Sequence, residues 1–140
     1  MVTAIHDLGV LLREMQPALR DGDYVFCCVP PQEAKDHIAS ALCLFREEEG
    51  VTLILERSYA EGAGLRFGPV MRCITLTVHS ALEAVGLTAA VSAALTRHGI
   101  SANVVAGYHH DHIFVPERDA ERTLETLRAL SCSAREKGDK

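Results

Sequence analysis

Three histidines and an aspartate form the densest group of chemically active side chains in the sequence. They are His109, His110, Asp111 and His112. Neutral imidazole and carboxylate groups are ligands that Zn²⁺ and Ni²⁺ accept, and His110 and His112 would share one face of a strand. The same residues also suit a solvated hairpin turn or a pH-sensitive ligand loop. The sequence leaves these three interpretations open, and we expect no resident metal.

The remaining reactive side chains do not favour catalysis. Cys27 and Cys28 are neighbours, and adjacent residues of a strand point to opposite faces, so we do not expect them to form a redox pair. No nucleophile elbow, Walker loop or dinucleotide-binding glycine motif occurs. We therefore expect a protein without enzymatic activity and without a cofactor. Five cysteines are expected to be buried, reduced and small hydrophobes: Cys27, Cys28, Cys43, Cys73 and Cys132.

Composition indicates a small globular protein. The 140 residues are 48% apolar, which allows a sizeable core in one domain or in two small subdomains. The net charge is −5 and the basic residues are scattered, so nucleic acid is not an expected partner. No apolar run approaches the roughly 20 residues that span a bilayer, and the N-terminus lacks the features of a secretory signal. We expect a cytoplasmic protein that does not bind membranes.

Hydrophobic periodicity predicts the elements that position these residues. In the first half we expect a helix over 5–15, a buried strand over 24–29 and a degenerate helix around 32–40. A hairpin of strands 41–45 and 51–55 should follow, around the solvated turn 46–50, and then a short helix over 59–65. In the second half we expect a strand over 74–78, a helix from about Gly86 to Gly99, a hairpin of strands 101–107 and 112–115, and a helix after Pro116.

The two halves follow a similar order and form a weak internal repeat. Strand, helix, hairpin, helix is the order of a ferredoxin-like α+β unit, with an antiparallel sheet and its helices on one face. We expect two such units in tandem, the first over residues 1–68 and degenerate, the second over 69–131. Residues 132–140 show no apolar periodicity and are predicted to be a flexible tail.

The second half resembles an ACT domain, in the branch found at the C-terminus of aspartate kinases and in the animal cytosolic arginine sensors. The resemblance rests on 84–91 (AVGLTAAV), on 99–101 (GIS) and above all on 107–117 (GYHHDHIFVPE). The first half is similar to small bacterial tandem ACT proteins, through 21–26 (DGDYVF) and 45–53 (FREEEGVTL). Together these segments imply two ferredoxin-like ACT units of βαββαβ topology.

The resemblance also implies a ligand site, with a small molecule held between ACT units. Backbone N–H groups at the start of the helix would bind a carboxylate with the help of the helix dipole. Asp111 would accept from an ammonium or guanidinium group, and Tyr108 would offer its ring face to the same cation. The complete set implied by position is Val85, Gly86, Leu87, Thr88, Ser101, Ala102, Gly107, Tyr108 and Asp111.

These observations predict a regulatory or sensor module that binds a small molecule, namely an amino acid, and acts as a homodimer. Two alternatives stay open. One is a structural module that pairs through a sheet edge or helix face and binds no ligand. The other is a metal-binding protein centred on His109, His110 and His112. For Asp111, a turn-capping role is the alternative to ligand binding.

Overall fold

The computed structural model describes residues 3–138, which divide into two compact units. One unit is discontinuous in sequence and contains the described residues up to Arg20 together with those from Cys73 onward. We call it the split unit. The other, Asp21–Arg72, is continuous and we call it the inserted unit. Each is described by itself below.

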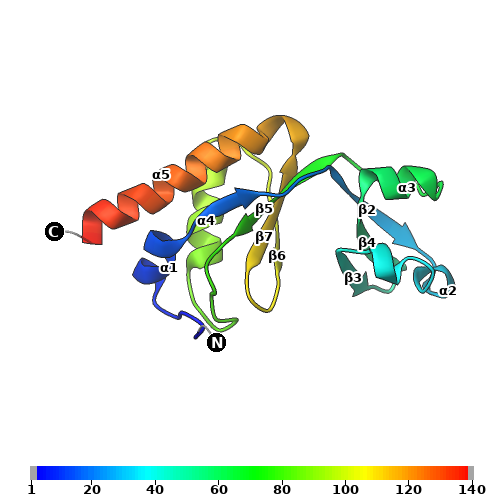
Figure 1. Ribbon diagram of the computed structural model, residues 1–140, viewed down its shortest axis with the longest axis horizontal. Coiled ribbons are helices and arrows are strands. Elements are labelled where there is room, and N and C mark those ends of the chain that lie inside the picture. The colour runs from blue at the N-terminus through cyan, green and yellow to red at the C-terminus, as the bar shows by residue number, and fades with distance from the viewer. Residues whose placement is uncertain (1–2, 139–140) are drawn as a thin grey trace. The chain divides into compact units, whose positions relative to one another are not determined.

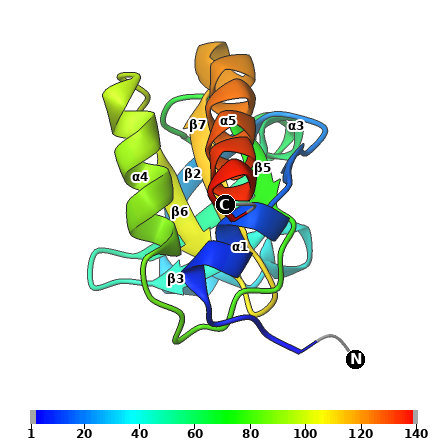
Figure 2. The same ribbon diagram turned by 90° about the vertical axis from the view of Figure 1, so that its left-hand side faces the viewer.

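The split unit is an antiparallel sheet covered by helices. Its strands lie in the order β1-β5-β7-β6, and Figures 1 and 2 show α4 and α5 side by side along the sheet with α1 near the end of α5. The elements are α1 (Leu8–Glu14), β1 (Pro17–Leu19), β5 (Met71–Leu76, which belongs to this unit from Cys73 onward), α4 (Leu87–Arg97), β6 (Asn103–Ala106), β7 (Asp111–Pro116), the 3₁₀ turn η2 (Glu117–Asp119) and α5 (Ala120–Gly138).

The core of the split unit follows from the two periodicities of the sequence. Ile74 and Leu76 alternate with threonines along β5 and turn their side chains toward the helices, where they are fully or almost fully buried. Val91 and Leu95 repeat at four-residue spacing on α4 and pack into the same cluster. Apolar burial of this kind is the main favourable contribution to the folding of the unit.

The strand β1 is the fourth strand of this sheet, and no periodicity of its residues predicted it. Leu19 pairs with Ile74, and the Arg20 N–H donates to the carbonyl of Cys73 over 2.9 Å. Leu11 and Met15 of the N-terminal segment are buried in the same core. The predicted division into 1–68 and 69–131 therefore differs from the compact units, because residues 3–20 pack with the C-terminal half.

The inserted unit contains antiparallel strands in the order β3-β4-β2, with Tyr24 of β2 paired with Met71 at the start of β5. Val25, Leu53 and Leu55 form the centre of its core. The predicted degenerate helix around 32–40 breaks into two short pieces. The elements are β2 (Tyr24–Val29), α2 (Pro31–Ala34), the 3₁₀ turn η1 (Ile38–Ser40), β3 (Cys43–Arg46), β4 (Val51–Glu56) and α3 (Arg57–Gly62).

These two units confirm the predicted α+β class with antiparallel sheets and a ferredoxin-like strand order. In each unit a further strand joins the edge of the sheet next to the first strand of the repeat: β1 beside β5 in the split unit, and the start of β5 beside β2 in the inserted unit. Within residues 3–138, no helix combines the length and the apolar character that crossing a bilayer requires.

The C-terminal segment differs from its prediction as a flexible tail, because α5 continues as a helix through Gly138. Ser131 is buried, and its hydroxyl donates to the carbonyl of Arg13 over 3.3 Å, a contact between distant parts of the chain. Arg135 donates to the Ser131 hydroxyl one turn earlier. These contacts hold the helix where periodicity alone predicts none; Asp139 and Lys140 lie outside the described residues.

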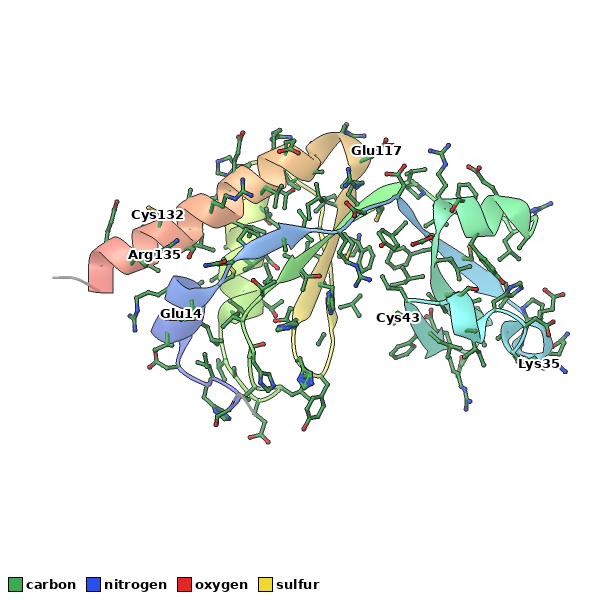
Figure 3. All side chains as sticks on the ribbon, viewed as in Figure 1. Glu14, Lys35, Cys43, Glu117, Cys132 and Arg135 are labelled. Atoms are coloured by element: carbon green, nitrogen blue, oxygen red, sulfur yellow. The ribbon has the colours of Figure 1, made fainter. Side chains whose placement is uncertain are left out.

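The cysteines differ in burial. Burial raises the pKa of the Cys73 thiol to about 11 against a smaller opposing effect of Arg20, and burial also raises the pKa of Cys27. These two are buried thiols, as predicted, and Cys43 is half-buried. Cys28 and Cys132 are exposed instead, since Cys28 is on the opposite face of β2 from Cys27 and Cys132 lies on the outer side of α5 (Figure 3).

Candidate functional site

A pocket of about 830 Å³ lies in the split unit, at the end where β5 leaves the sheet and the β6–β7 hairpin turns. Three segments form it: the N-terminal stretch before α1, the loop from β5 to α4, and the hairpin turn. Because four of its residues are histidines, we call it the histidine pocket. It is lined by Ala4, His6, Thr77, His79, Ser80, Ala81, Leu82, Glu83, Tyr108, His109 and His110.

The hairpin turn is held by a close backbone approach at Gly107. The Gly107 N–H donates to the carbonyl of His110 over 2.8 Å. A Cβ at position 107 would lie 3.0 Å from that carbonyl oxygen and 3.1 Å from Nε2 of His112, which leaves little room for any side chain. Glycine at this position therefore lets the turn close tightly and present Tyr108 and His109 at the end of the hairpin.

The N-terminal stretch is fixed to the loop after β5 by two backbone hydrogen bonds. The Ile5 N–H donates to the carbonyl of His79 over 2.8 Å, and the Ala81 N–H donates to the carbonyl of Ile5 over 2.9 Å. Ile5 and Ser80 thus form a parallel bridge. This bridge brings Ala4 and His6 to the wall of the pocket.

Aromatic and imidazole rings meet edge to face in the pocket, with His109 at the centre. The centroid of the His109 ring is 4.8 Å from that of His79 and 5.1 Å from that of Tyr108, with interplanar angles of 84° and 87°. The rings of His109 and His110 are farther apart, at 6.3 Å, and tilted. Edge-to-face contact is a favourable geometry for rings and keeps this group in a defined arrangement.

Asp111 and His112 lie beside the pocket rather than in its lining. Burial raises the pKa of the Asp111 carboxyl, against the opposing effects of His112, of a hydrogen bond with Ser80 and of His110. Burial also lowers the pKa of His112, Arg20 and His110 lower it further, and Asp111 opposes them. Asp111 thus forms a hydrogen bond with Ser80, which lines the pocket. His112 forms a 2.9 Å hydrogen bond with the hydroxyl of Thr75.

The structure separates the predicted ligand residues into three groups. Tyr108 lines the pocket, with Gly107 and Asp111 adjacent to it in the same turn. Gly86 is the N-cap of α4 with a positive φ of 103°, which favours glycine. Leu87 has its side chain in the core, Val85 is 82% exposed, and Thr88 is exposed on the first turn of α4.

Ser101 and Ala102 are not brought together with the others. They precede β6, whereas Gly107 follows it, so the length of the strand separates them from the hairpin turn by about 20 Å at roughly 3.3 Å per residue. Ser101 is exposed, and Ala102 packs against the core of the split unit. A ligand role for these two residues remains a prediction.

Sequence reasoning missed the N-terminal wall of the pocket. Ala4 and His6 are far from the hairpin in sequence, and only the Ile5–Ser80 bridge brings them close. The metal alternative receives no support from geometry, because no three histidine, cysteine, aspartate or glutamate residues within 3–138 are placed to hold an ion together.

Comparison with known proteins agrees with this description. One sequence profile of the ACT domain matches residues 3–72, and a second ACT domain profile matches residues 70–129. Comparison with curated proteins yields no match. Both profiles follow the linear sequence, so the first includes the N-terminal residues that pack with the split unit.

Solved structures agree with this description in their fold. A Vibrio cholerae protein, described as of unknown function and a possible transport protein, is 50% identical with a TM-score of 0.80, over 89% of this chain and 95% of that one. An Agrobacterium tumefaciens protein is 20% identical, with a TM-score of 0.71 over 84% and 90%. The regulatory subunit of aspartate kinase from Thermus flavus is 11% identical, with a TM-score of 0.63 over 82% and 96%. The last two show likeness of fold alone.

Proposed function

Because this chain belongs to the ACT-domain family, we propose that it is a regulatory module that binds an amino acid in the histidine pocket. ACT domains are in general regulatory and non-catalytic, and both matching profiles describe ACT domains. The observation that carries the proposal is the pocket itself. Its volume of about 830 Å³ is within the usual range for small-molecule sites, of roughly 300–1,000 Å³.

The chemistry of the pocket wall supports a small polar ligand. Hydroxyl, imidazole and carboxylate groups alternate with alanine and leucine side chains, so the wall can bind both the polar groups and the apolar side chain of an amino acid. The start of α4 adds backbone N–H groups near the same end of the unit, and its N-cap, Gly86, has no side chain to satisfy them.

A thermal-shift screen of the twenty amino acids tests this function. A ligand that binds only the native state raises the melting temperature. At a free ligand concentration of 100 times Kd, binding increases the free energy of unfolding by about 2.7 kcal/mol. We expect a dose-dependent rise of roughly 5 to 10 °C for at least one amino acid. Tyr108→Ala should reduce the rise, whereas Arg128→Ala, which removes an exposed side chain of α5 outside the pocket, should leave it unchanged.

Absence of a shift with all twenty amino acids at millimolar concentration would contradict the function. A shift that survives both Tyr108→Ala and Asp111→Ala would instead contradict its location. Asp111→Ala is included because the carboxylate contacts Ser80, which lines the pocket.

A second candidate function is protein interaction through the inserted unit. Phe45 of the edge strand β3 is 67% exposed, and Ile38 of the preceding turn is 56% exposed. An edge strand also leaves backbone N–H and C=O groups available for pairing with another chain. We propose a homodimer on this basis. Light scattering should give twice the chain mass, and Phe45→Lys should give a monomer; a monomeric wild-type chain would contradict the proposal.

A further inference from the structure

The rings of the histidine pocket form a surface that suits another ring. Tyr108 is 76% exposed although it is a large aromatic residue, and its ring contacts His109 edge to face. His79 also contacts His109 edge to face. A planar apolar group that packs against Tyr108 would remove aromatic surface from water and extend the same edge-to-face arrangement.

The apolar rim of the pocket leads to the same conclusion. Leu82 and Val85 are 68% and 82% exposed in the loop between β5 and α4. Exposed large apolar residues gathered beside a pocket are typical of a site that an apolar group covers. Leu82 lines the pocket, so an occupant with an apolar body would bury part of this surface.

The charges of the pocket indicate the polar end of the occupant. Among the described residues that line it there is no lysine or arginine, and Glu83 is the only carboxylate. A carboxylate attracts an ammonium group and repels an anion. The face of the Tyr108 ring also attracts a cation, by its quadrupole.

His110 adds a second acceptor for such a group. Its Nδ1 lies 3.2 Å from the carbonyl oxygen of Val78, and since a carbonyl only accepts, Nδ1 carries the hydrogen of this bond. In a neutral imidazole the other nitrogen, Nε2, is then an acceptor. Glu83 and His110 thus provide two acceptors for an ammonium group in one pocket.

We propose that the histidine pocket selects a small primary amine that carries an aromatic ring, the chemistry shared by aromatic amino acids and the amines obtained from them. The ring packs on Tyr108 and His109, and the ammonium group binds Glu83 and His110. This inference rests on the proposed function, because it names the class of ligand for the same pocket. It differs from the expectation that Asp111 binds the ammonium or guanidinium group of the ligand, since Asp111 does not line the pocket.

Calorimetric titration of the full chain with six compounds tests the inference. They are phenylalanine, tryptophan, phenethylamine, 3-phenylpropionate, leucine and arginine. We expect at least one ring-bearing amine to bind with a Kd about tenfold lower than leucine or arginine. We expect 3-phenylpropionate, which has the ring without the amine, to bind at least about tenfold more weakly than phenylalanine. Comparison of phenylalanine with phenethylamine then distinguishes amino acids from amines as the source.

Three variants locate the binding. Tyr108→Leu keeps an apolar side chain but removes the ring, and it should raise the Kd of the ring-bearing amine about tenfold. Glu83→Gln should raise the same Kd by a similar factor and reduce the preference over 3-phenylpropionate. Arg128→Ala removes an exposed side chain of α5 that does not line the pocket, and it should leave these Kd values unchanged. All three positions are exposed, and amide spectra would verify that each variant remains folded.

The outcomes separate the inference from the proposed function. If arginine or leucine binds as tightly as phenylalanine and Tyr108→Leu weakens it, the regulatory function stands and the aromatic class is wrong. Tighter binding of 3-phenylpropionate than of phenylalanine would overturn recognition of the amine. If none of the six compounds binds and the twenty amino acids give no thermal shift, both proposals fail.

Discussion

At the residue scale, the two ionisable groups beside the pocket have opposite effects on stability as the pH changes. The pKa of His112 is lowered from its ordinary value of 6.5, so the unfolded chain takes up a proton there before the folded chain does. The stability due to His112 is therefore complete above pH 6.5 and is lost as the pH falls through the lowered value. The raised pKa of Asp111 acts in the other direction, because its cost to stability at neutral pH disappears as the pH falls toward 3.8.

We predict that the melting temperature falls as the pH is lowered from about 7 to about 5, and that His112→Asn makes this fall smaller. Asparagine can replace the hydrogen bond to Thr75 without taking up a proton. Measurement of melting temperature against pH for both chains checks the prediction. The matched control is His6→Asn, at an exposed position, which should keep the wild-type slope. An equal slope in His112→Asn and the wild type would show that the prediction is wrong.

At the element scale, α1 is a part of the core although it is short. Its N-cap, Asp7, accepts a 2.9 Å hydrogen bond from the N–H of Val10, and Leu11 on the inner face is fully buried. A helix of this length is not stable on its own, so it depends on the core of the split unit. Loss of the buried side chain should therefore affect that unit before the inserted one.

Leu11→Ala is expected to destabilise the split unit by about 2–5 kcal/mol, the range for a buried leucine reduced to alanine. Hydrogen exchange, read separately for peptides of the two units, measures this effect. Peptides of α4 and α5 should lose protection while those of β2 and β4 keep it. Glu14→Ala, on the exposed side of the same helix (Figure 3), should change stability by less than about 0.5 kcal/mol. Equal loss of protection in both units would contradict the assignment of α1 to the split unit.

The elements also show how far sequence reasoning reaches. The alternation of Ile74 and Leu76 with threonines predicted β5, because a half-buried strand repeats every two residues. The three residues of β1 are too short to show a period, and they are ordered by pairing with β5. The end of α5 was missed for a similar reason, since its order depends on the contact of Ser131 with the distant Arg13.

In the candidate site too, the sequence predicted the local segment but not the contacts between distant segments. The hairpin from Gly107 to Asp111 stood out by residue type, and the structure places Tyr108 and two of its histidines in the pocket. His6 had no local signal, because a backbone bridge between distant segments brings it there. For Asp111, no sequence signal indicated that its half-buried carboxylate has Ser80 as a partner, and its ligand role stays a prediction.

At the scale of the whole molecule, the two residues that flank the inserted unit in sequence, Arg20 and Cys73, are paired neighbours in the split unit. A short turn could therefore connect them directly. β1 and β5 are antiparallel, and the hydrogen bond from the Arg20 N–H to the carbonyl of Cys73 marks the last pair before the interruption. Two residues suffice to join such a pair in a tight hairpin, and Asn-Gly suits the required left-handed turn.

We predict that a chain in which residues 21–72 are replaced by Asn-Gly folds and retains the histidine pocket. The described residues that line the pocket all belong to the split unit, so the replacement removes none of them. Circular dichroism and amide dispersion would measure folding, and titration with the ligand of the full chain would test the pocket. A control chain that begins at Cys73 lacks α1 and β1 and should not fold cooperatively. Failure of the Asn-Gly chain would mean that the pairing of β1 with β5 depends on the inserted unit.

The interruption of the split unit has a consequence during protein synthesis. The ribosome makes β1 before the inserted unit and makes its partner β5 only afterwards. Nascent domains acquire structure as soon as their residues have emerged, so the inserted unit has its full sequence while the split unit is still incomplete. Throughout that interval Leu11 and Met15 have no core to enter, because α4 and α5 have not been translated. The N-terminal segment is therefore the part of the nascent chain that a chaperone would need to shield longest.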